Sequence, residues 1–370
     1  MTGGRTLFVH LVEPAHWRAA LASGAVRPPS LDARGFVHLS APEQVHVPAR
    51  ALFPGRRDLL LLVVDPARLT DEVRIEPGVP AAPDGALFPH LYGPLPTSSV
   101  VAVVPYRPPV APVLPAPDDV PGRTLSFYAS LPVRRAVGVG DVPGGVAVLD
   151  PDVAHSRDNN RLVLTSPVDA DAIEAAADEV AGNAGWPSRT ASLLWPGADD
   201  VAAELGRRGW EVEELLLMAR RPASLPGAAR AEVVPQSEVH ELWDRSWRRD
   251  LAGLGPRLDA VVAQLVGREE LNDRVLAVSD VVVREDGRVV AAAQLRVDGA
   301  TAAVESVMTD PAARGRGHGD AVLAKALALA VDAGCDLVVL EADAQDWPRH
   351  WYARRGFAPV GTTWSLHRPA

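Results

Sequence analysis

Two arginines and three glycines lie close together in the segment 314–319, which reads RGRGHG within TDPAARGRGHGDAVL. Glycines let backbone N–H groups approach a pyrophosphate closely, and the start of a following helix adds about half a positive charge. Arg314 and Arg316 could add charge-assisted hydrogen bonds to the same phosphates. The alternative is a strand-to-helix turn in which glycine serves geometry only. The segment is neither a Walker loop, because no Lys-Ser/Thr pair follows, nor a G-x-G-x-x-G loop.

Two further residues have the chemistry of a proton donor and a proton acceptor. Tyr352 lies in WYARRGF, and Glu305 lies in TAAVESVMT, which leads into the glycine segment. A tyrosine can protonate a leaving group, and a carboxylate can remove a proton from an amine. The alternatives are a packed core tyrosine and a solvent-facing strand carboxylate.

The elements that must position these residues follow from hydrophobic periodicity. DVVVRE and VVAAAQLRV flank the turn Asp286-Gly287 and predict a hairpin, and TAAVESVMT predicts the next strand. GDAVLAKALALAVDAG predicts a helix that ends at Gly334, and LVVLEA a short buried strand next to Cys335, which we interpret as an apolar filler. The order hairpin, strand, loop, helix, strand, helix, strand indicates a mixed α/β sheet.

The combination of VMTDPxxRGRGxG with WYARRGF resembles the GCN5-related N-acetyltransferase (GNAT) family. The resemblance implies that acetyl-coenzyme A binds with its pyrophosphate in the glycine loop and its pantetheine arm along the preceding strand. A backbone N–H there, that of Met308, would polarise the thioester carbonyl, and His318 would face solvent or a phosphate. The implied cofactor-binding residues are Val307, Met308, Thr309, Arg314, Gly315, Arg316, Gly317, His318, Gly319 and Asp320.

The same resemblance gives Tyr352 the role of general acid, with Glu305 as our candidate for the general base. The family's usual form is N-x-x-A-x-x-x-Y-x-x-x-G-F, and this chain departs from it upstream. Gln345 stands where asparagine is frequent, and Pro348 where alanine is frequent. A proline can occupy the first turn of a helix, so we expect it to shorten the helix and leave Tyr352 on it.

Proline-rich breaks divide the chain into blocks. RPPVAPVLPAPDDVPG, at 107–122, contains six prolines, and its composition predicts a stiff spacer without a helix. A second, weaker break is RPASLPGAAR at 221–230. We therefore predict a block at 1–106, the linker 107–122, and two further blocks at 123–222 and 228–370.

The last two blocks end in similar sequences. RRGWEVEELLLMARRP (207–222) and RRGFAPVGTTWSLHRP (354–369) share two arginines, a glycine, an aromatic residue and a final Arg-Pro at the same offsets. A duplicated unit of about 147 residues explains this. In each copy Gly209 or Gly356 would close a helix in the left-handed conformation, and a terminal strand would follow.

The first copy lacks the glycine loop. Near position 167 it reads RLVLTSPVDADAIEAAADE, which contains no glycine and has acids where a phosphate would lie. We therefore expect a degenerate GNAT-like copy that does not bind coenzyme A. Its run SRDNNRLVL could hold a site at Asp158-Asn159 or be a polar turn at the interface between the copies, and the second is favoured.

The first block predicts a separate α+β domain with five of the ten histidines. FVHL, RPPSL, GFVHLS, DLLLLVVDP and LFPHLYGPLP resemble a small bacterial family designated DUF952. That resemblance implies a fold like that of ADP-ribosyltransferases, although their catalytic glutamate has no counterpart here. The residues expected to converge on a pocket, or to form a packed structural set, are His10, His38, Ser40, His90 and Tyr92.

Composition limits the functional class. The chain has 47 acidic and 37 basic residues, a net charge of −10, which disfavours a nucleic-acid binder. No uninterrupted apolar run of about 18 residues occurs and the N-terminus does not read as a secretory signal, so we expect no membrane span and a cytoplasmic protein. A single cysteine excludes a cysteine-rich zinc cluster, and no metal is expected.

Three functions follow as hypotheses. The first is direct transfer of an acetyl group from acetyl-coenzyme A to an amine in a ternary complex. The second is a coenzyme-A-binding sensor without turnover, and the third a nucleotide or ADP-ribose activity in the first block. The expected partner is a small-molecule or peptide amine, with a homodimer as a possible assembly. Residues that could line the acceptor pocket are Trp243, Trp247, Asp346 and Trp347.

Overall fold

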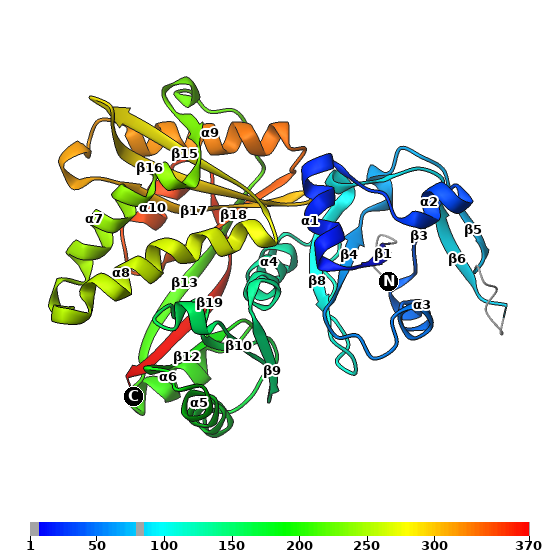
Figure 1. Ribbon diagram of the computed structural model, residues 1–370, viewed down its shortest axis with the longest axis horizontal. Coiled ribbons are helices and arrows are strands. Elements are labelled where there is room, and N and C mark those ends of the chain that lie inside the picture. Colours follow the sequence, from blue (N-terminus) through cyan, green and yellow to red (C-terminus); the bar gives the residue numbers. More distant parts are fainter. Residues whose placement is uncertain (1–6, 79–84, 370) are drawn as a thin grey trace.

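A computed structural model describes residues 7–78 and 85–369 of the chain. Figure 1 shows a smaller N-terminal unit beside a larger unit built around a long, strongly twisted sheet. The larger unit contains both predicted copies. This is the mixed α/β architecture that the sequence predicts.

The N-terminal unit is organised by β4, whose sequence LLLLVV is buried at every position. A strand covered on both faces has this continuous apolar pattern, and β4 is the centre of the sheet β1-β4-β8. A second sheet has the order β3-β6-β5, and β2 pairs with β7. The elements are β1 (Phe8–Val12), α1 (Pro14–Ser23), β2 (Ala25–Val26), α2 (Pro29–Arg34), β3 (Val37–His38), α3 (His46–Leu52), β4 (Leu59–Val64), β5 (Val73–Pro77), β6 (Leu87–Leu91), β7 (Leu95–Pro96) and β8 (Val100–Tyr106).

From their first hairpin onward, the two copies repeat one order of elements: three strands, a helix, a strand, a helix and a strand. The first copy comprises α4 (Val120–Arg135), β9 (Gly138–Val142), β10 (Gly145–Leu149), β11 (Arg161–Leu164), α5 (Ala170–Ala184), β12 (Ser188–Leu193), α6 (Asp199–Arg207) and β13 (Glu211–Arg220). The second copy comprises β14 (Glu232–Val234), α7 (His240–Asp250), α8 (Leu258–Gly267), β15 (Ala277–Glu285), β16 (Arg288–Asp298), β17 (Thr301–Thr309), α9 (His318–Asp332), β18 (Leu337–Asp343), α10 (Pro348–Ala353) and β19 (Ala358–Pro369). Gly209 and Gly356 have φ of 89° and 85°, so both predicted left-handed caps are present.

The copies exchange their terminal strands. Within the described part of the chain, one sheet of 11 strands has the order β14-β15-β16-β17-β18-β13-β19-β12-β11-β10-β9. The last strand of the first copy, β13, therefore pairs with β18 of the second, and β19 of the second pairs with β12 of the first. The similar segments at 207–222 and 354–369 meet as the antiparallel pair β13–β19. Because the sheet continues through both copies, the boundary predicted between them stays a prediction.

The sheet opens between β17 and β18. These parallel strands pair only from Thr301↔Leu337 to Ala303↔Val339, although β17 runs on to Thr309 and β18 to Asp343. Beyond that point β17 stays with β16 and β18 stays with β13. Ser306 has φ of 52° where the β16–β17 register shifts, so a bulge bends β17 at the opening. In the first copy, β11 pairs with β12 up to its last residue, Leu164.

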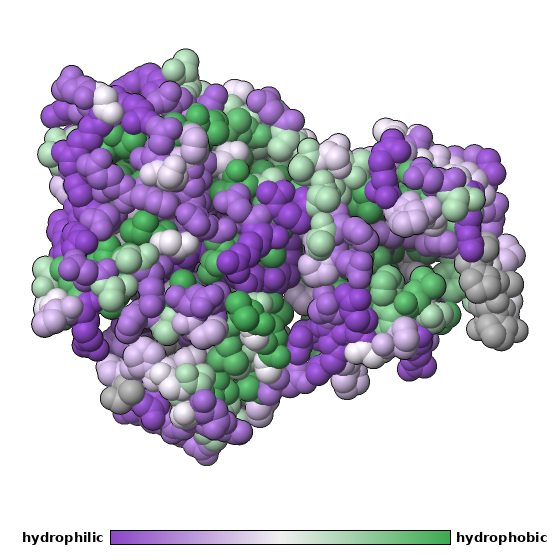
Figure 2. Space-filling view, viewed as in Figure 1, coloured by the Kyte–Doolittle hydropathy of each residue, from purple (hydrophilic) through white to green (hydrophobic). Residues whose placement is uncertain are grey.

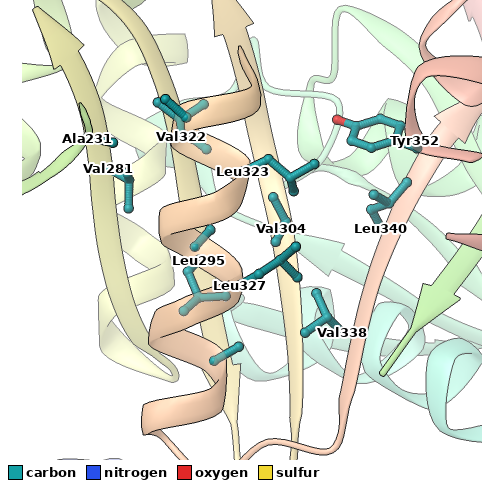
Figure 3. Packing of buried hydrophobic residues seen from close by; sticks show 14 of the residues in the cluster. Ala231, Val281, Leu295, Val304, Val322, Leu323, Leu327, Val338, Leu340 and Tyr352 are labelled. Carbon is teal, nitrogen blue, oxygen red and sulfur yellow. The ribbon is translucent and has the colours of Figure 1, made fainter. Parts of the chain in front are cut away.

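Different helices cover the two faces of the sheet at this opening. On one face α9 packs its apolar residues against β16, β17 and β18 in the core cluster that Figure 3 shows. On the other face Phe127 and Leu131 of α4, which belongs to the first copy, pack against Ala303 and Val339. The opening therefore lies between an α9 face made by the second copy and an α4 face to which both copies contribute.

The linker, expected to be a stiff spacer without a helix, contains the start of a helix and packs against the N-terminal unit. Its last three residues form the first turn of α4, with Asp119 accepting a hydrogen bond from the Gly122 N–H at 2.9 Å. The prediction of no helix was wrong there, because a proline at the first turn needs no N–H partner. Leu114 packs against apolar residues of β4 and β8. The N-terminal unit is thus held close to the copies.

A tight contact fixes the N-terminal unit to the β16–β17 turn. The Ala300 N–H donates to Val100 O at 2.7 Å, and Trp17 Nε1 donates to Asp298 Oδ1 at 2.8 Å. At Gly299, where φ is 74°, a Cβ would lie 2.4 Å from Val100 O. Only glycine fits this approach. The contact is at the end of the β16–β17 hairpin farthest from the opening.

The surface facing the viewer in Figure 2 is mainly hydrophilic, with apolar residues gathered over β9 and β10 beside α4. Val137, just before β9, is 63% exposed. Within the described residues, every helix is too short or too polar to cross a membrane.

Candidate active site at the opening of the sheet

The predicted phosphate loop lies at the N-terminus of α9. Gly315 and Gly317 have φ of 78° and 77°, a conformation that favours glycine. Gly317 is the N-cap residue, and no described side chain caps the helix. The first N–H groups of α9 are therefore free to bind an anion, with the helix dipole in support.

A cleft of about 470 Å³ lies over this helix end, as a concave site for a small molecule requires. It is lined by the end of β17, the glycine loop, α7 and α10. Nine of the ten implied cofactor-binding residues line it, with Arg316 as the exception. The lining residues from the loop and strand are Val307, Met308, Thr309, Arg314, Gly315, Gly317, His318, Gly319 and Asp320. The donor set and the space together fit a coenzyme with a pyrophosphate.

Two of the predicted phosphate ligands are engaged elsewhere. His318 is 4% exposed, and its Nε2 lies 2.8 Å from Glu285 Oε1, so the expectation that its ring faces solvent or a phosphate was wrong. Arg316 pairs with the same carboxylate at 2.7 Å. The hairpin turn brings Glu285 beside the loop, which local sequence does not indicate. Arg314 is exposed, and among the described residues it donates only to Thr309 O, at 3.3 Å, so it is the arginine of the loop available to a phosphate.

The alternation of the β16–β17 ladder corrects the expected oxyanion donor. The Asp310 N–H donates to Val290 O at 2.8 Å. Along an antiparallel ladder, hydrogen-bonded pairs of residues alternate with pairs that are not hydrogen-bonded. The pair Met308 and Ala292 lies two positions from the pair Asp310 and Val290, so it is also hydrogen-bonded. The Met308 N–H therefore faces β16. The N–H groups of Val307 and Thr309 are turned toward the opening.

Tyr352 lies on α10 at the edge of the cleft. Pro348 occupies the first turn of this helix, as expected. The ring is 8% exposed and packs against Phe357, while its hydroxyl has no hydrogen-bond partner in the described chain. In Figure 3 the hydroxyl points toward α9 and β17. Burial and the charge of Glu305 raise the pKa of Tyr352 further above its usual value, so it stays protonated and can act as a donor.

Glu305 lies on the other face of the opening. The Tyr128 hydroxyl, on α4 of the first copy, donates to Glu305 Oε1 at 2.6 Å. Burial raises the pKa of Glu305, while the Arg296 charge and the Tyr128 hydrogen bond oppose this rise. A carboxylate with a raised pKa is a stronger base than a free one.

Sequence reasoning missed two residues of this site. Glu341 follows four buried residues of β18, and burial together with the charge of Glu305 raises its pKa to about 7. An acid at the end of a buried strand was a signal that could have identified it. Tyr128 gave no such signal, because only the packing of α4 brings it to Glu305.

The matching position in the first copy is unsuited to a phosphate. Its helix α5 is capped by the Asp169 carboxylate, which accepts from the Ala172 N–H at 2.8 Å. The hollow beside it, about 300 Å³, is lined by four carboxylates and a single arginine, Arg208. Capping removes a free donor and the acids repel anions, so the structure supports the expectation that this copy does not bind coenzyme A.

The SRDNN segment lies at the interface of the two copies. Arg268 of the second copy pairs with Asp158 at 2.9 Å and donates to Ser156 Oγ at 3.0 Å. The Ser156 hydroxyl in turn bonds Asn159 Oδ1 at 2.7 Å. Asp158 therefore serves the interface, the interpretation that the sequence favoured.

The five residues predicted for the N-terminal pocket do come together, as a packed set. His10, Ser40 and His90 are buried, and the Phe36 ring stacks on His90 with centroids 4.1 Å apart. Burial and the charge of His90 lower the pKa of His38 to about 4. The Tyr92 hydroxyl donates to Glu76 at 2.8 Å. This arrangement favours the structural interpretation over a nucleotide pocket.

Of the four residues proposed for the acceptor pocket, Trp347 lines the cleft and is 60% exposed. Trp243 is buried in the core between α7 and the sheet, and Trp247 packs against that core. Asp346 is exposed. Among the described residues, no group of three or more histidine, cysteine, aspartate or glutamate side chains could hold a metal ion.

Two family models match parts of the chain. Residues 11–103 match DUF952, a protein of unknown function, and residues 237–357 match the acetyltransferase (GNAT) family. Both predicted resemblances are confirmed for these segments. Among curated proteins there is no significant match.

Solved structures show similarity to both segments. A GCN5-related N-acetyltransferase from Kribbella flavida is 21% identical with a TM-score of 0.46, over 66% of this chain and 95% of that one. A tandem GNAT protein from the clavulanic acid biosynthesis pathway is 14% identical with a TM-score of 0.38, over 54% and 67%. Protein CC0527 from Caulobacter crescentus is 38% identical with a TM-score of 0.25, over 27% and 85%.

Proposed function

We propose that this chain, which carries a GNAT acetyltransferase domain at residues 237–357 and a DUF952 domain at residues 11–103, transfers an acetyl group from acetyl-coenzyme A to an amine. The observation that supports the proposal best is the opening between β17 and β18, where the pairing stops at Ala303↔Val339. A cleft with an uncapped helix end lies on one face of this opening, and a basic carboxylate lies on the other.

Binding of the coenzyme would use the α9 face. The free N–H groups of α9 and the Arg314 guanidinium would hold the pyrophosphate. The N–H groups of Val307 and Thr309, turned toward the opening, would bond the pantetheine arm and the thioester carbonyl. When bound, the coenzyme supplies an acetyl group activated as a thioester.

Two side chains would move the protons. Glu305 accepts a proton from the acceptor ammonium, which leaves a neutral amine with a free electron pair. The amine nitrogen forms a bond to the acetyl carbon, and the bond from that carbon to sulfur breaks. The Tyr352 hydroxyl donates a proton to the departing thiolate, and the nitrogen of the new amide loses its second proton to solvent. Tyr352 then takes a proton from solvent and Glu305 releases its proton to solvent, which restores both groups.

Equilibrium binding of acetyl-coenzyme A tests the proposal first. Arg314→Glu should weaken binding at least about tenfold, because a charge-assisted contact becomes a repulsion. Arg221→Glu makes the same charge change at an exposed residue outside the cleft and should bind like the wild type. Equal affinity for all three proteins would refute the phosphate site.

Release of the coenzyme A thiol, measured with a panel of amines, tests turnover. Thiol release that depends on the amine supports the transferase. Binding of acetyl-coenzyme A without thiol release for any amine would instead support the coenzyme-A-binding sensor.

A further inference from the structure

Two carboxylates beside the opening form no ion pair within the described residues, although the charge of Arg296 lowers the pKa of Glu305 and that of Arg161 lowers the pKa of Glu341. Glu305 and Glu341 are half-buried, and neither forms an ion pair within the described chain. Neighbouring acids are paired: Glu269 with Arg296 at 2.7 Å and Asp158 with Arg268 at 2.9 Å. An unpaired carboxylate in such a place is costly unless it is protonated or meets a cation.

Strand register places the two carboxylates on the same face of the opening. Ala303 and Val339, the last paired residues, both contact α4. Side chains alternate along a strand, so residues two positions further on return to the α4 face. Those residues are Glu305 and Glu341, one on each side of the opening. The Tyr128 and Thr363 hydroxyls bond one carboxylate each, at 2.6 and 3.1 Å.

Two further acidic residues, Asp343 and Glu213, lie on the same face at a greater distance from the opening. Asp343 is two residues beyond Glu341 on β18, at about 6.6 to 7 Å along the strand. It pairs in register with Leu215 of β13, so Glu213, two residues from Leu215, lies on the same face. Burial and the charge of Asp343 raise the pKa of Glu213, although Arg157 opposes this. None of these acids forms an ion pair within the described residues.

A second observation comes from the other side of the same opening. The Tyr352 hydroxyl, in a side chain more than nine-tenths buried, is without a hydrogen-bond partner in the described chain and faces the opening from the α9 side. Because Tyr352 lines the cleft, a ligand there can bond this hydroxyl.

We propose that the acceptor of this reaction is an aliphatic diamine, bound as a dication on the α4 face with one ammonium group between Glu305 and Glu341 and the other at Asp343 and Glu213. The proposal rests on the acetyl transfer proposed above. The spacing along β18 is one that an extended four-carbon chain can span. The first copy contributes Tyr128 and Glu213, so the degenerate copy forms part of the acceptor site.

Calorimetric titration of the full-length protein, with coenzyme A present, tests the site. Three probes of similar length are compared: 1,4-diaminobutane, 1-aminobutane and butane-1,4-diol. The diamine should bind at least about tenfold more tightly than the monoamine, and the diol should not bind in the same range. Equal binding of diamine and diol, or no binding of either amine, would overturn the proposal.

The variant Glu341→Gln tests whether the Glu341 carboxylate binds the diamine. Glutamine keeps the volume and can accept the Thr363 hydrogen bond, so the variant should fold and bind coenzyme A normally. Its affinity for the diamine should fall at least tenfold. The control variant Glu179→Gln, which changes an exposed residue of α5, should bind the diamine with the affinity of the wild type. Unchanged diamine affinity in Glu341→Gln would also overturn the proposal.

The two proposals can fail separately. If coenzyme A binds and the diamine does not, the acceptor assignment alone is wrong. If the diamine binds in the absence of coenzyme A and the coenzyme does not bind at all, the acetyl transfer is wrong while the cation site stands.

Discussion

The Tyr128 hydroxyl of the first copy donates a 2.6 Å hydrogen bond to Glu305 of the second. The hydrogen bond stabilises the ionised carboxylate and lowers the pKa of Glu305 against the effect of burial. The first copy therefore contributes, together with burial and the charge of Arg296, to the pKa of the proposed general base.

Tyr128→Phe should raise the pKa of Glu305, because the phenylalanine removes the donor and keeps the apolar ring. A base must be deprotonated to act, so the acidic limb of the pH profile of kcat/KM should move to higher pH. At pH values on this acidic limb, kcat/KM of the variant should be severalfold lower than that of the wild type. Thiol release measured from pH 5 to 9 checks this.

Tyr92→Phe is the matched control, since Tyr92 makes the same kind of hydrogen bond, to Glu76, in the N-terminal unit. Its pH profile should match that of the wild type. A Tyr128→Phe profile of unchanged shape would show that Tyr128 only packs.

Tyr352→Phe should lower kcat about a hundredfold, the usual contribution of a general acid. Its affinity for acetyl-coenzyme A should change little, because the ring and its packing against Phe357 remain. Single-turnover thiol release and equilibrium binding separate the two effects. A variant with normal kcat would remove Tyr352 from the mechanism.

Glu341→Gln should stabilise the protein at pH 8. The pKa of Glu341 is about 7 in the folded chain, above its ordinary value. The stability linked to this proton is present below the unfolded pKa and is lost as pH rises through about 7. Glutamine avoids that loss, so the free energy of unfolding at pH 8 should rise by about 2 kcal/mol.

Chemical denaturation at pH 5 and pH 8 measures this difference, which should be small at pH 5. Glu179→Gln should behave like the wild type at both values. If Glu341→Gln is only as stable as the wild type at pH 8, the Glu341 carboxylate is already neutralised by a cation.

Gly299→Ala should weaken the contact between the N-terminal unit and the β16–β17 turn. The new Cβ would lie 2.4 Å from Val100 O, at a cost of about 1 to 3 kcal/mol. Gly287→Ala shares the positive φ, 79°, but has no atom within 4 Å of the added Cβ, so it isolates the clash from backbone strain. Thermal unfolding should rank Gly299→Ala as the less stable, with coenzyme affinity equal in both.

Local features of the site could be read from the sequence. Glycines that need positive φ, a proline in the first turn of α10 and the apolar period of α9 depend on neighbours within a few residues. The terminal strands of both copies, marked by Gly209 and Gly356, were found for the same reason. The surroundings of Arg316 and His318 could not be predicted from local sequence, because Glu285 reaches these residues from the β15–β16 hairpin.

The sequence by itself determined that the second copy has a loop able to hold a pyrophosphate and that the first has none, since both facts depend on residue types within one turn. Only the tertiary structure decided that β13 inserts between β18 and β19, that β17 and β18 part, and that Tyr128 meets Glu305 across the copies. Strand pairing joins segments far apart in the chain, and many partners offer similar backbone hydrogen bonds. The choice among them depends on packing of the whole sheet.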